Sequence, residues 1–372
     1  MADYNRVAMP TPLPIQHAVS LRAFNTFGIE ATARTYLHLT DVAQLDQIRN
    51  DAHLIGLPRL VLGGGSNLLL TGDFPGLLLH VGLRGITRVD NDGEVTEKEH
   101  GSAPGQANAN ANAEIGRRAV VVRAAAGESW QALVDWTLAH GFGGLENLNL
   151  IPGSVGAAPI QNIGAYGAEA GQFIVSLRYF DLQTGEVVQL AGADCGFGYR
   201  DSIFKHALAG RAVILDVDFA LPQPWRPNLR YADLAATFAG RPAPDARAIA
   251  AAVATIRRSK LPDPAVIGNA GSFFKNPVVS AACCAALRAR WPQLVGYPQP
   301  DGSVKLAAGY LIDQCGWKGR TLGAAGVHDR QALVLVNRGG ATGSEIHRLA
   351  QAIQTDVQAR FGVLLEPEPI IV

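Results

Sequence analysis

A glycine-rich turn at the end of a strand constrains the fold most. The apolar segment Arg59–Leu62 predicts a strand, and Gly63-Gly64-Gly65-Ser66-Asn67 follows it directly. Consecutive glycines let backbone N–H groups point into one concavity, which suits a pyrophosphate. A Rossmann site would need a helix straight after the glycines, whereas Leu68–Gly72 and a strand-like Leu77–Val81 come next. The motif alone disfavours a Rossmann fold and leaves an ordinary tight turn and a phosphate site equally open.

A second loop, residues 147–167, is denser still in glycine and small polar residues. An ordinary connection between strands would not need so many amide and hydroxyl groups. Together the two loops resemble the nucleotide-binding segments of the FAD-binding fold shared with vanillyl-alcohol-type oxidases. The resemblance implies that FAD is bound by Gly63, Gly64, Gly65, Ser66, Asn67, Ile151, Pro152, Gly153, Ser154, Gly156, Asn162, Gly164 and Tyr166. No His or Cys interrupts the first loop where covalent members attach their flavin, so we expect non-covalent FAD.

Composition excludes several classes of protein. At 372 residues the chain is too long for one ordinary core. Lys+Arg and Asp+Glu are both 32, so no overall field favours nucleic acid or a membrane surface. No apolar run is long enough for a membrane helix, and the N-terminus lacks the pattern of a signal peptide. The four cysteines match no metal spacing and no disulfide framework, so we expect no metal and a reducing, cytoplasmic location.

The order of elements indicates α+β rather than a doubly wound sheet. Besides those named above, predicted strands cover Tyr36–Leu39, Ala119–Ala125, alternating segments up to Ala220, and Ala332–Val336. The chain ends in a strand-like Val363–Ile371 that Pro367 and Pro369 break. Predicted helices begin near Asp41 and at Ser129 and cover 246–258, Val304–Cys315 and Thr342–Phe361, the last with a capping box of Thr342 and Glu345. Residues 91–118 are polar, aperiodic and rich in Gly, Ala and Asn, which predicts a surface insertion that the chemistry does not need.

Two longer strings are more specific than the loops. They are Gly198-Tyr199-Arg200-Asp201-Ser202-Ile203-Phe204-Lys205 and Gly268-Asn269-Ala270-Gly271-Ser272-Phe273-Phe274-Lys275-Asn276-Pro277. Leu365-Glu366-Pro367-Glu368 closes the chain. In this order they resemble the signatures of the UDP-N-acetylenolpyruvoylglucosamine reductase (MurB) family, type I, from about Asn25 to the C-terminus. The resemblance implies an FAD-dependent oxidoreductase of peptidoglycan synthesis. With NADPH as hydride donor, it would reduce UDP-N-acetylglucosamine enolpyruvate to UDP-N-acetylmuramate.

Three residues carry the chemistry that the resemblance implies. Arg200 and Glu368 would meet the charge that builds on the substrate carboxylate after hydride transfer. Ser272 would then donate a proton to the second carbon of the former double bond. Taken singly, each residue has a simpler interpretation, because Arg200 beside Asp201 suits a surface ion pair, Ser272 a turn and Glu368 a solvated site.

Five further residues match substrate-binding positions of the family. Tyr231, Lys260 and Asn276 are the firmer matches, and Lys275 and Gln331 the weaker. Tyr231 stands in Arg230-Tyr231-Ala232-Asp233, where the family carries a glycine in place of Ala232. That departure affects the backbone of the loop rather than the tyrosine.

The expected architecture is a two-lobed FAD-binding fold with a C-terminal α/β substrate-binding lobe. Lobe 1 would cover 1–85 and be completed by a C-terminal strand in 362–372, lobe 2 would cover 86–240, and the substrate-binding domain 257–361. We expect a monomer with a small-molecule substrate and no nucleic-acid or membrane partner. Two alternatives stay open: an FAD oxidase of a hydroxy acid or sugar on the same fold, and an inactive nucleotide-sugar sensor.

Overall fold

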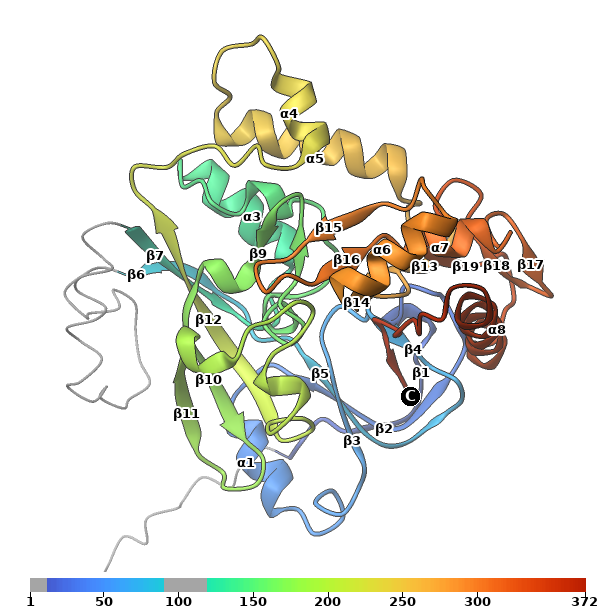
Figure 1. The fold of residues 1–372 in the computed structure, drawn as a ribbon. Helices are drawn as coiled ribbons and strands as arrows, with labels where there is room; N and C mark the ends of the chain where they lie inside the picture. Colours follow the sequence, from blue (N-terminus) through green and yellow to red (C-terminus); the bar gives the residue numbers. More distant parts are fainter. Residues whose placement is uncertain (1–11, 90–118) are drawn as a thin grey trace, which may run out of the picture.

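The structure is a computed structural model that describes residues 12–89 and 119–372 (Figure 1). The predicted insertion at 91–118 lies outside the described residues. Helices and sheets are mixed without a regular βαβ order, so the α+β prediction is confirmed. None of the helices in the described part of the chain is long and apolar enough to cross a membrane.

The first sheet carries the strand that leads into the first glycine-rich loop. Its order is β1-β2-β5-β3, with β2 and β3 both parallel to β5 and β1 antiparallel to β2. Leu77, Leu78 and Leu79 on the central β5 are fully buried, as expected for a parallel strand covered on both faces. The bounds are β1 Gln16–Ser20, β2 Thr32–Leu39, α1 Ala43–Asn50, β3 Arg59–Leu62 and β5 Phe74–Val81.

The second sheet is antiparallel, in the order β11-β10-β12-β7-β6, and stands beside the first (Figure 1). Helix α3 covers it, beginning at Ser129, whose side chain caps the helix, and burying Trp130 edge-on against Phe219. The predicted helix from Ser129 is therefore confirmed. The bounds are β6 Ile86–Val89, β7 Ala119–Ala125, α3 Trp130–Ala139, β10 Ile174–Asp181, β11 Val187–Ala191 and β12 Ala212–Pro222.

The second glycine-rich loop and two projecting helices connect this sheet to the C-terminal region. The loop contains the short hairpin β8 (Gly164–Ala165) and β9 (Ala168–Glu169). Helices α4 (Ala232–Phe238) and α5 (Ala246–Lys260) stand above the body of the protein in Figure 1. Asp245 caps α5 through Ala248 N–H, where the sequence predicted a helix.

The C-terminal region holds two small sheets, β13-β19-β18-β17 and β14-β16-β15. The predicted helix over Val304–Cys315 is wrong in its first turn. Val304–Leu306 forms β16, because these residues pair with both β14 and β15, and the helix α7 begins only at Ala308. The bounds are β13 Gly268–Ser272, β14 Val278–Val279, α6 Ala281–Arg290, β15 Gly296–Pro298, β16 Val304–Leu306, α7 Ala308–Gln314, β17 Thr321–Leu322, β18 Ala325–Val327 and β19 Val334–Asn337.

The chain ends in a long helix and a return to the first lobe. α8 (Gly343–Phe361) has the predicted capping box of Thr342 and Glu345 and ends at Gly362 in the left-handed conformation. The predicted segment Val363–Ile371 is interrupted at its prolines as expected: only β20 (Ile370–Ile371) is a regular strand, and Pro367 makes one isolated bridge with Phe274. Pro367 and Pro369 lack the N–H group that a longer ladder would require. β20 pairs in parallel with β4 (Leu68–Leu69), just after the first glycine-rich loop.

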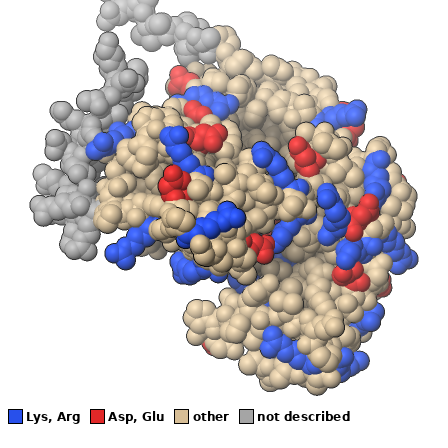
Figure 2. Space-filling model, turned by 90° about the horizontal axis from the view of Figure 1, so that it is seen from above, with Lys and Arg blue, Asp and Glu red and all other residues tan. Residues whose placement is uncertain are grey.

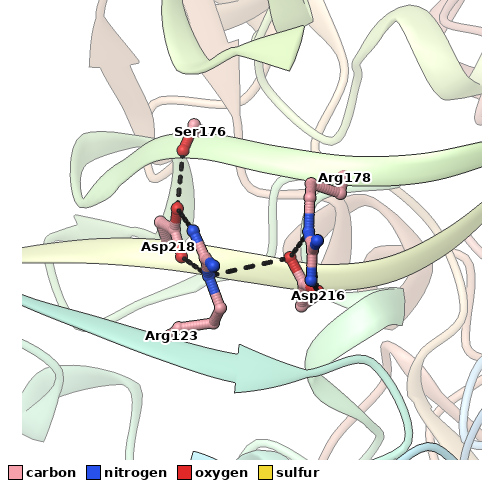
Figure 3. A network of polar contacts seen from close by, with 5 residues as sticks. All are labelled: Arg123, Ser176, Arg178, Asp216 and Asp218. Atoms are coloured by element: carbon pink, nitrogen blue, oxygen red, sulfur yellow. Dashed lines mark hydrogen bonds and ion pairs between the residues drawn. The ribbon is translucent and has the colours of Figure 1, made fainter. Parts of the chain in front are cut away.

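A charged network braces the second sheet (Figure 3). Arg123 on β7 donates to both carboxylate oxygens of Asp218 on β12, at 2.7 and 2.9 Å, and Ser176 on β10 donates to the same carboxylate at 2.8 Å. Arg178 pairs with Asp216 on the neighbouring position of the same face. Both aspartates are buried, so their charges need these donors.

Replacing Asp218 with Asn should destabilise the protein. The uncharged amide accepts through one oxygen only and leaves Arg123 with the more distant Asp216, 3.9 Å from its Nε, so we expect a loss of about 2–3 kcal/mol in the free energy of unfolding. Urea unfolding followed by circular dichroism measures this loss. Asp313→Asn, which breaks the exposed pair with Lys318, is the control and should cost less than about 1 kcal/mol. Equal losses for the two variants would show that the network does not brace the sheet.

Candidate active site

A cavity of about 330 Å³ runs along β3 and both glycine-rich loops. Nine of the predicted cofactor residues line it, and so does the predicted catalytic residue Glu368. The lining cofactor residues are Gly63, Gly64, Gly65, Ser66, Asn67, Pro152, Gly153, Ser154 and Gly156. Trp130, Leu60 and Ile214 add apolar walls.

The two loops touch each other as well as the cavity. A Cβ atom on Gly63 would lie 2.2 Å from Ser154 Oγ, and one on Gly64 would lie 2.9 Å from Gly153 Cα. Ser66 Oγ donates to Pro152 O at 3.1 Å. These glycines are therefore required by the contact between loops in addition to any ligand. The sequence shows the glycines, but it does not show that segments 90 residues apart meet there.

The first loop offers unused backbone donors. The N–H groups of Gly64, Gly65, Ser66 and Asn67 donate to no atom of the described residues. Four consecutive free donors lining a cavity form a concavity that favours an anion such as a pyrophosphate. The residues present thus fit the diphosphate of a dinucleotide, and the free donors favour the phosphate site among the two interpretations left open by the motif.

The other four predicted cofactor residues do not line the cavity. Asn162 donates to Glu169 Oε2 and to Gly198 O, both at 3.0 Å, and so joins the second loop to the segment before Arg200. Gly164 accepts from Arg200 at 2.8 Å. The ring of Tyr166 packs edge-on against Tyr231, at 5.0 Å between centroids. Ile151 packs partly buried against the main core.

Strained backbone gathers around this loop. Positive φ angles occur at Leu150 (60°), Asn162 (44°), Tyr166 (49°) and Arg200 (56°). Residues with a Cβ rarely adopt this conformation unless their surroundings enforce it, and such strain clusters at functional sites. The distribution supports a functional loop rather than a simple connection.

Arg200 and Glu368 meet although 168 positions separate them. Arg200 Nε donates to Glu368 Oε1 at 2.9 Å, and both side chains are largely buried. Burial raises the pKa of the Glu368 carboxyl above its usual range, against the opposing effect of Arg200, Lys205 and Lys275. Asn67 Nδ2 donates to the backbone carbonyl of Glu368 at 3.2 Å, which ties this pair to the first loop.

Two cations beside the pair were missed from the sequence. Lys205 lines the cavity and donates to Arg200 O at 3.0 Å, and burial lowers its pKa. Lys305 lies 3.7 Å above the ring of Tyr199, and burial lowers its pKa too. Lys205 ends the string that contains Arg200, so a signal was present. Lys305 belongs to a strand that was predicted as a helix.

Ser272 stands at an irregular end of β13. The pairing of β13 with β19 shifts register between Asn269 and Ser272, and such bulges re-aim side chains next to active sites. The Ser272 hydroxyl has no hydrogen-bond partner among the described residues. The next residue, Phe273, accepts from Glu368 N at 2.8 Å, so the serine and the glutamate lie on adjoining segments.

The predicted substrate residues fall into separate groups. Lys260 pairs with Asp233 and lies 5.6 Å from the centre of the Tyr231 ring, beside Tyr166. Asn276 N donates to Tyr199 Oη at 3.3 Å and its Oδ1 accepts from Ala308 N at the start of α7. The remaining two are Lys275, paired with Glu366, and Gln331, whose side chain lies beside Gly309 of α7.

Charge is mixed across the molecular surface. In Figure 2, positive and negative side chains are interspersed over the face shown, in keeping with the net charge of zero. No group of three or more His, Cys, Asp or Glu in residues 12–89 and 119–372 could hold a metal ion. Any anionic ligand therefore depends on local cations such as Arg200 and Lys205.

Two family models match the chain. Residues 33–191 match an FAD binding domain, and residues 263–372 match the C-terminal domain of UDP-N-acetylenolpyruvoylglucosamine reductase. The first match contains both glycine-rich loops, and the second contains Ser272 and Glu368.

Curated relatives and a solved structure agree with these matches. The UDP-N-acetylenolpyruvoylglucosamine reductase of Burkholderia mallei is 54% identical over 94% of this chain and 95% of its own. That of Paraburkholderia phymatum is 53% identical over 98% and 99%. The crystal structure of the reductase from Thermus caldophilus matches with a TM-score of 0.61, at 21% identity over 97% of this chain and 98% of that one, which shows a shared fold.

Gly64→Ala should reduce the amount of FAD that the purified protein retains. Its Cβ would lie 2.9 Å from Gly153 Cα, so the two loops must separate and the N–H concavity must open. Flavin absorbance per protein measures the loss, with circular dichroism to confirm folding. Gly72→Ala is the control, because nothing lies within 4 Å of the added Cβ. Full flavin content in folded Gly64→Ala would show that the loop contact does not shape the site.

Proposed function

The chain belongs to the UDP-N-acetylenolpyruvoylglucosamine reductase family, and from this membership we propose that it reduces UDP-N-acetylglucosamine enolpyruvate to UDP-N-acetylmuramate with NADPH. One observation carries the proposal beyond family membership. A buried Arg200–Glu368 pair adjoins a cavity whose walls are the two glycine-rich loops of an FAD binding domain. A cation and a carboxyl group at that place suit a substrate carboxylate that gains charge during reduction.

The residues that would hold FAD are those of the two loops. The free N–H groups of Gly64–Asn67 would bind its pyrophosphate, and the apolar walls would cover its rings. When bound, the flavin accepts a hydride from NADPH and delivers it to the double bond of the substrate. The absence of a His or Cys in the first loop supports a non-covalent complex.

Arg200 and Glu368 would stabilise the charge that develops on the substrate carboxylate. Arg200 is fixed by Glu368 and by Gly164 O, so it can meet that charge without reorganising. Burial raises the pKa of Glu368, which favours the protonated form that can donate a hydrogen bond. Lys205 adds positive charge nearby and holds the carbonyl of Arg200.

Ser272 would then give a proton to the second carbon of the reduced double bond. Its hydroxyl is free of other partners in the described chain and lies on the segment that contacts the backbone of Glu368. A hydroxyl is a weak acid, so this step requires a strongly basic carbon, which the charged intermediate supplies.

The substrate diphosphate would be bound by Tyr231, Lys260, Asn276, Lys275 and Gln331. Tyr231 and Lys260 lie on α4–α5, whereas Asn276 contacts the start of α7. A substrate bound by both groups would place its nucleotide between lobe 2 and the C-terminal domain. We accordingly assign 1–85 with 362–372 to lobe 1, 86–240 to lobe 2 and 257–361 to substrate binding. The biological setting would be peptidoglycan precursor synthesis in the cytoplasm, with consequences for cell shape and division. The protein would act as a monomer.

Anaerobic mixing in two steps tests the function. NADPH should bleach the flavin absorbance of the purified protein, and UDP-N-acetylglucosamine enolpyruvate should then restore it without oxygen. A flavin that NADPH does not reduce, or that the enolpyruvate does not reoxidise, would contradict the proposal. Reduction of the flavin by a hydroxy acid or sugar, followed by fast reoxidation with oxygen, would indicate an oxidase instead.

Ser272→Ala should separate the two half-reactions. The serine is needed only after hydride transfer, so reduction of the flavin by NADPH should stay near the wild-type rate. Turnover with the enolpyruvate should fall by about 10²–10⁴-fold, the range for a lost general acid. Stopped-flow absorbance measures each half alone. Ser272→Cys should recover part of the lost turnover, because a thiol is a stronger acid than a serine hydroxyl. If Ser272→Ala slows both halves equally, the serine has a structural role.

The second half-reaction should slow as the pH rises. The protonated fraction of Glu368 falls as the pH passes its pKa, and burial places that pKa above the usual range for glutamate. Glu368→Gln keeps a hydrogen-bond donor but does not titrate, so its slower reaction should lose this dependence on pH. The measurement is the rate of flavin reoxidation by substrate across about pH 5–9. The same decline in Glu368→Gln would assign the titration to another group.

A further inference from the structure

The cavity has a direction that the chain itself defines. Asn67, at the end of the first loop, contacts the backbone of Glu368, so this end lies next to the Arg200–Glu368 pair. Arg59 lines the same cavity from the start of β3, four residues before the loop. A strand rises about 3.3 Å per residue, so Arg59 stands about 13 Å along β3 from the start of the loop, whose last residue contacts Glu368.

Arg59 carries a charge that no described residue neutralises. Its Nη2 donates to Ile55 O at 2.8 Å, which holds the guanidinium in place. Its Nε is buried and has no hydrogen-bond partner, and no carboxylate of the described chain lies within ion-pair distance. Buried donors are nearly always satisfied, so an unpaired one in a cavity wall requires an explanation. A cation of this kind also favours a ligand with acceptor atoms or an aromatic face.

The cavity is also lined by the chain that leads into β12. Leu208 and Gly210 precede this strand, and Ala212 is its first residue. Arg49 of α1 packs against Gly185, in the turn between β10 and β11. At the same end of the second sheet, Ala212 of β12 pairs with Asp181 of β10. Figure 1 shows α1 beside this turn. The segment from α1 to Arg59 and the start of β12 therefore share one end of the molecule.

We propose that Arg59 contacts the adenosine half of FAD and thereby makes the protein select FAD over FMN. The inference rests on the proposed function for the identity of the cofactor. With the pyrophosphate at Gly64–Asn67 and the reacting ring towards Arg200 and Glu368, the adenosine must extend along β3 towards Arg59. FMN lacks this half, so Arg59 would contribute nothing to its binding.

Binding of three probes to flavin-free, full-length protein tests this assignment. FAD, FMN and ADP are titrated against the wild type, Arg59→Met and Arg59→Lys. A lost contact with a charged group changes a dissociation constant by about tenfold or more. Arg59→Met should weaken FAD and ADP by that factor and leave FMN within about twofold. Arg34→Met, which removes an exposed cation from β2 of the same sheet, should change none of the three.

The outcomes separate the two proposals. If the wild type binds FAD no better than FMN, or if Arg59→Met weakens all three probes or none, Arg59 does not select the adenosine half. The melting temperature of the flavin-free variants shows whether an equal loss of affinity for all three probes comes from a damaged fold. Arg59→Lys keeps the charge and replaces Arg59→Met in the test if the Met variant does not fold. If the wild type binds no flavin at all, the proposed function itself fails.

Discussion

The approach of two glycine-rich loops governs the rest of the site. Gly63 and Gly64 lie so close to Ser154 and Gly153 that a single methyl group would push them apart. The first loop ends a strand of one sheet, and the second leads from α3 to β10 of the other. Their contact therefore fixes how the two sheets face each other, and the cavity is the space left between them. Backbone groups line much of that space because side chains are excluded there.

The charged pair depends on this arrangement. Arg200 follows the second loop, and Glu368 lies a few residues from the end of the described chain, so no local structure brings them together. Asn67 holds the carbonyl of Glu368, and β20 pairs with β4 directly after the first loop. Phe273 accepts from Glu368 N, which brings the segment of Ser272 to the same point. The terminal segment is thus bound to the first loop and to the segment of Ser272, and the Arg200 side chain reaches it from the third segment.

What the sequence can predict depends on how far apart along the chain the contacting residues lie. The capping box at Thr342, the helix after Ser129 and the strand before Gly63 depend on neighbours within a few residues, and all three were predicted correctly. Val304–Leu306 became a strand because of partners near 278 and 297, which three residues of local pattern cannot reveal.

Some features of the site can likewise be predicted from the sequence, and others depend on contacts between distant residues. The long strings mark Arg200, Ser272 and Glu368, and the structure brings Arg200 and Glu368 into contact and sets the segment of Ser272 beside them. The sequence alone does not show that the carboxyl of Glu368 is buried or that Lys205 lines the cavity. It also gives no sign that Arg59 Nε has no acceptor among the described residues, because pairing between distant side chains leaves no local pattern.

Two arginine–carboxylate pairs show how the fold shifts the pKa of two carboxyl groups in opposite directions. Arg211 binds both oxygens of Asp181, whose carboxylate also accepts from the N–H groups of Gln183 and Thr184. These donors, the Arg211 side chain first, lower the pKa of Asp181 and keep it charged. Among residues 12–89 and 119–372, the carboxyl of Glu368 accepts a hydrogen bond from Arg200 Nε alone, so burial prevails and its pKa rises.

Each carboxyl has an arginine partner, so the difference lies in the stronger effect of burial on Glu368 and in the larger number of donors around Asp181. A carboxylate with four donors has no reason to bind a proton, whereas one with a single donor in a buried site does. Because no backbone N–H group of the described residues donates to the Glu368 carboxyl, its second oxygen, Oε2, is free to contact a ligand. The proline on each side of it removes two N–H groups that could otherwise have folded back onto the carboxylate. The Pro367-Glu368-Pro369 sequence thus accounts for the break in the terminal strand and limits the backbone donors around the Glu368 carboxyl.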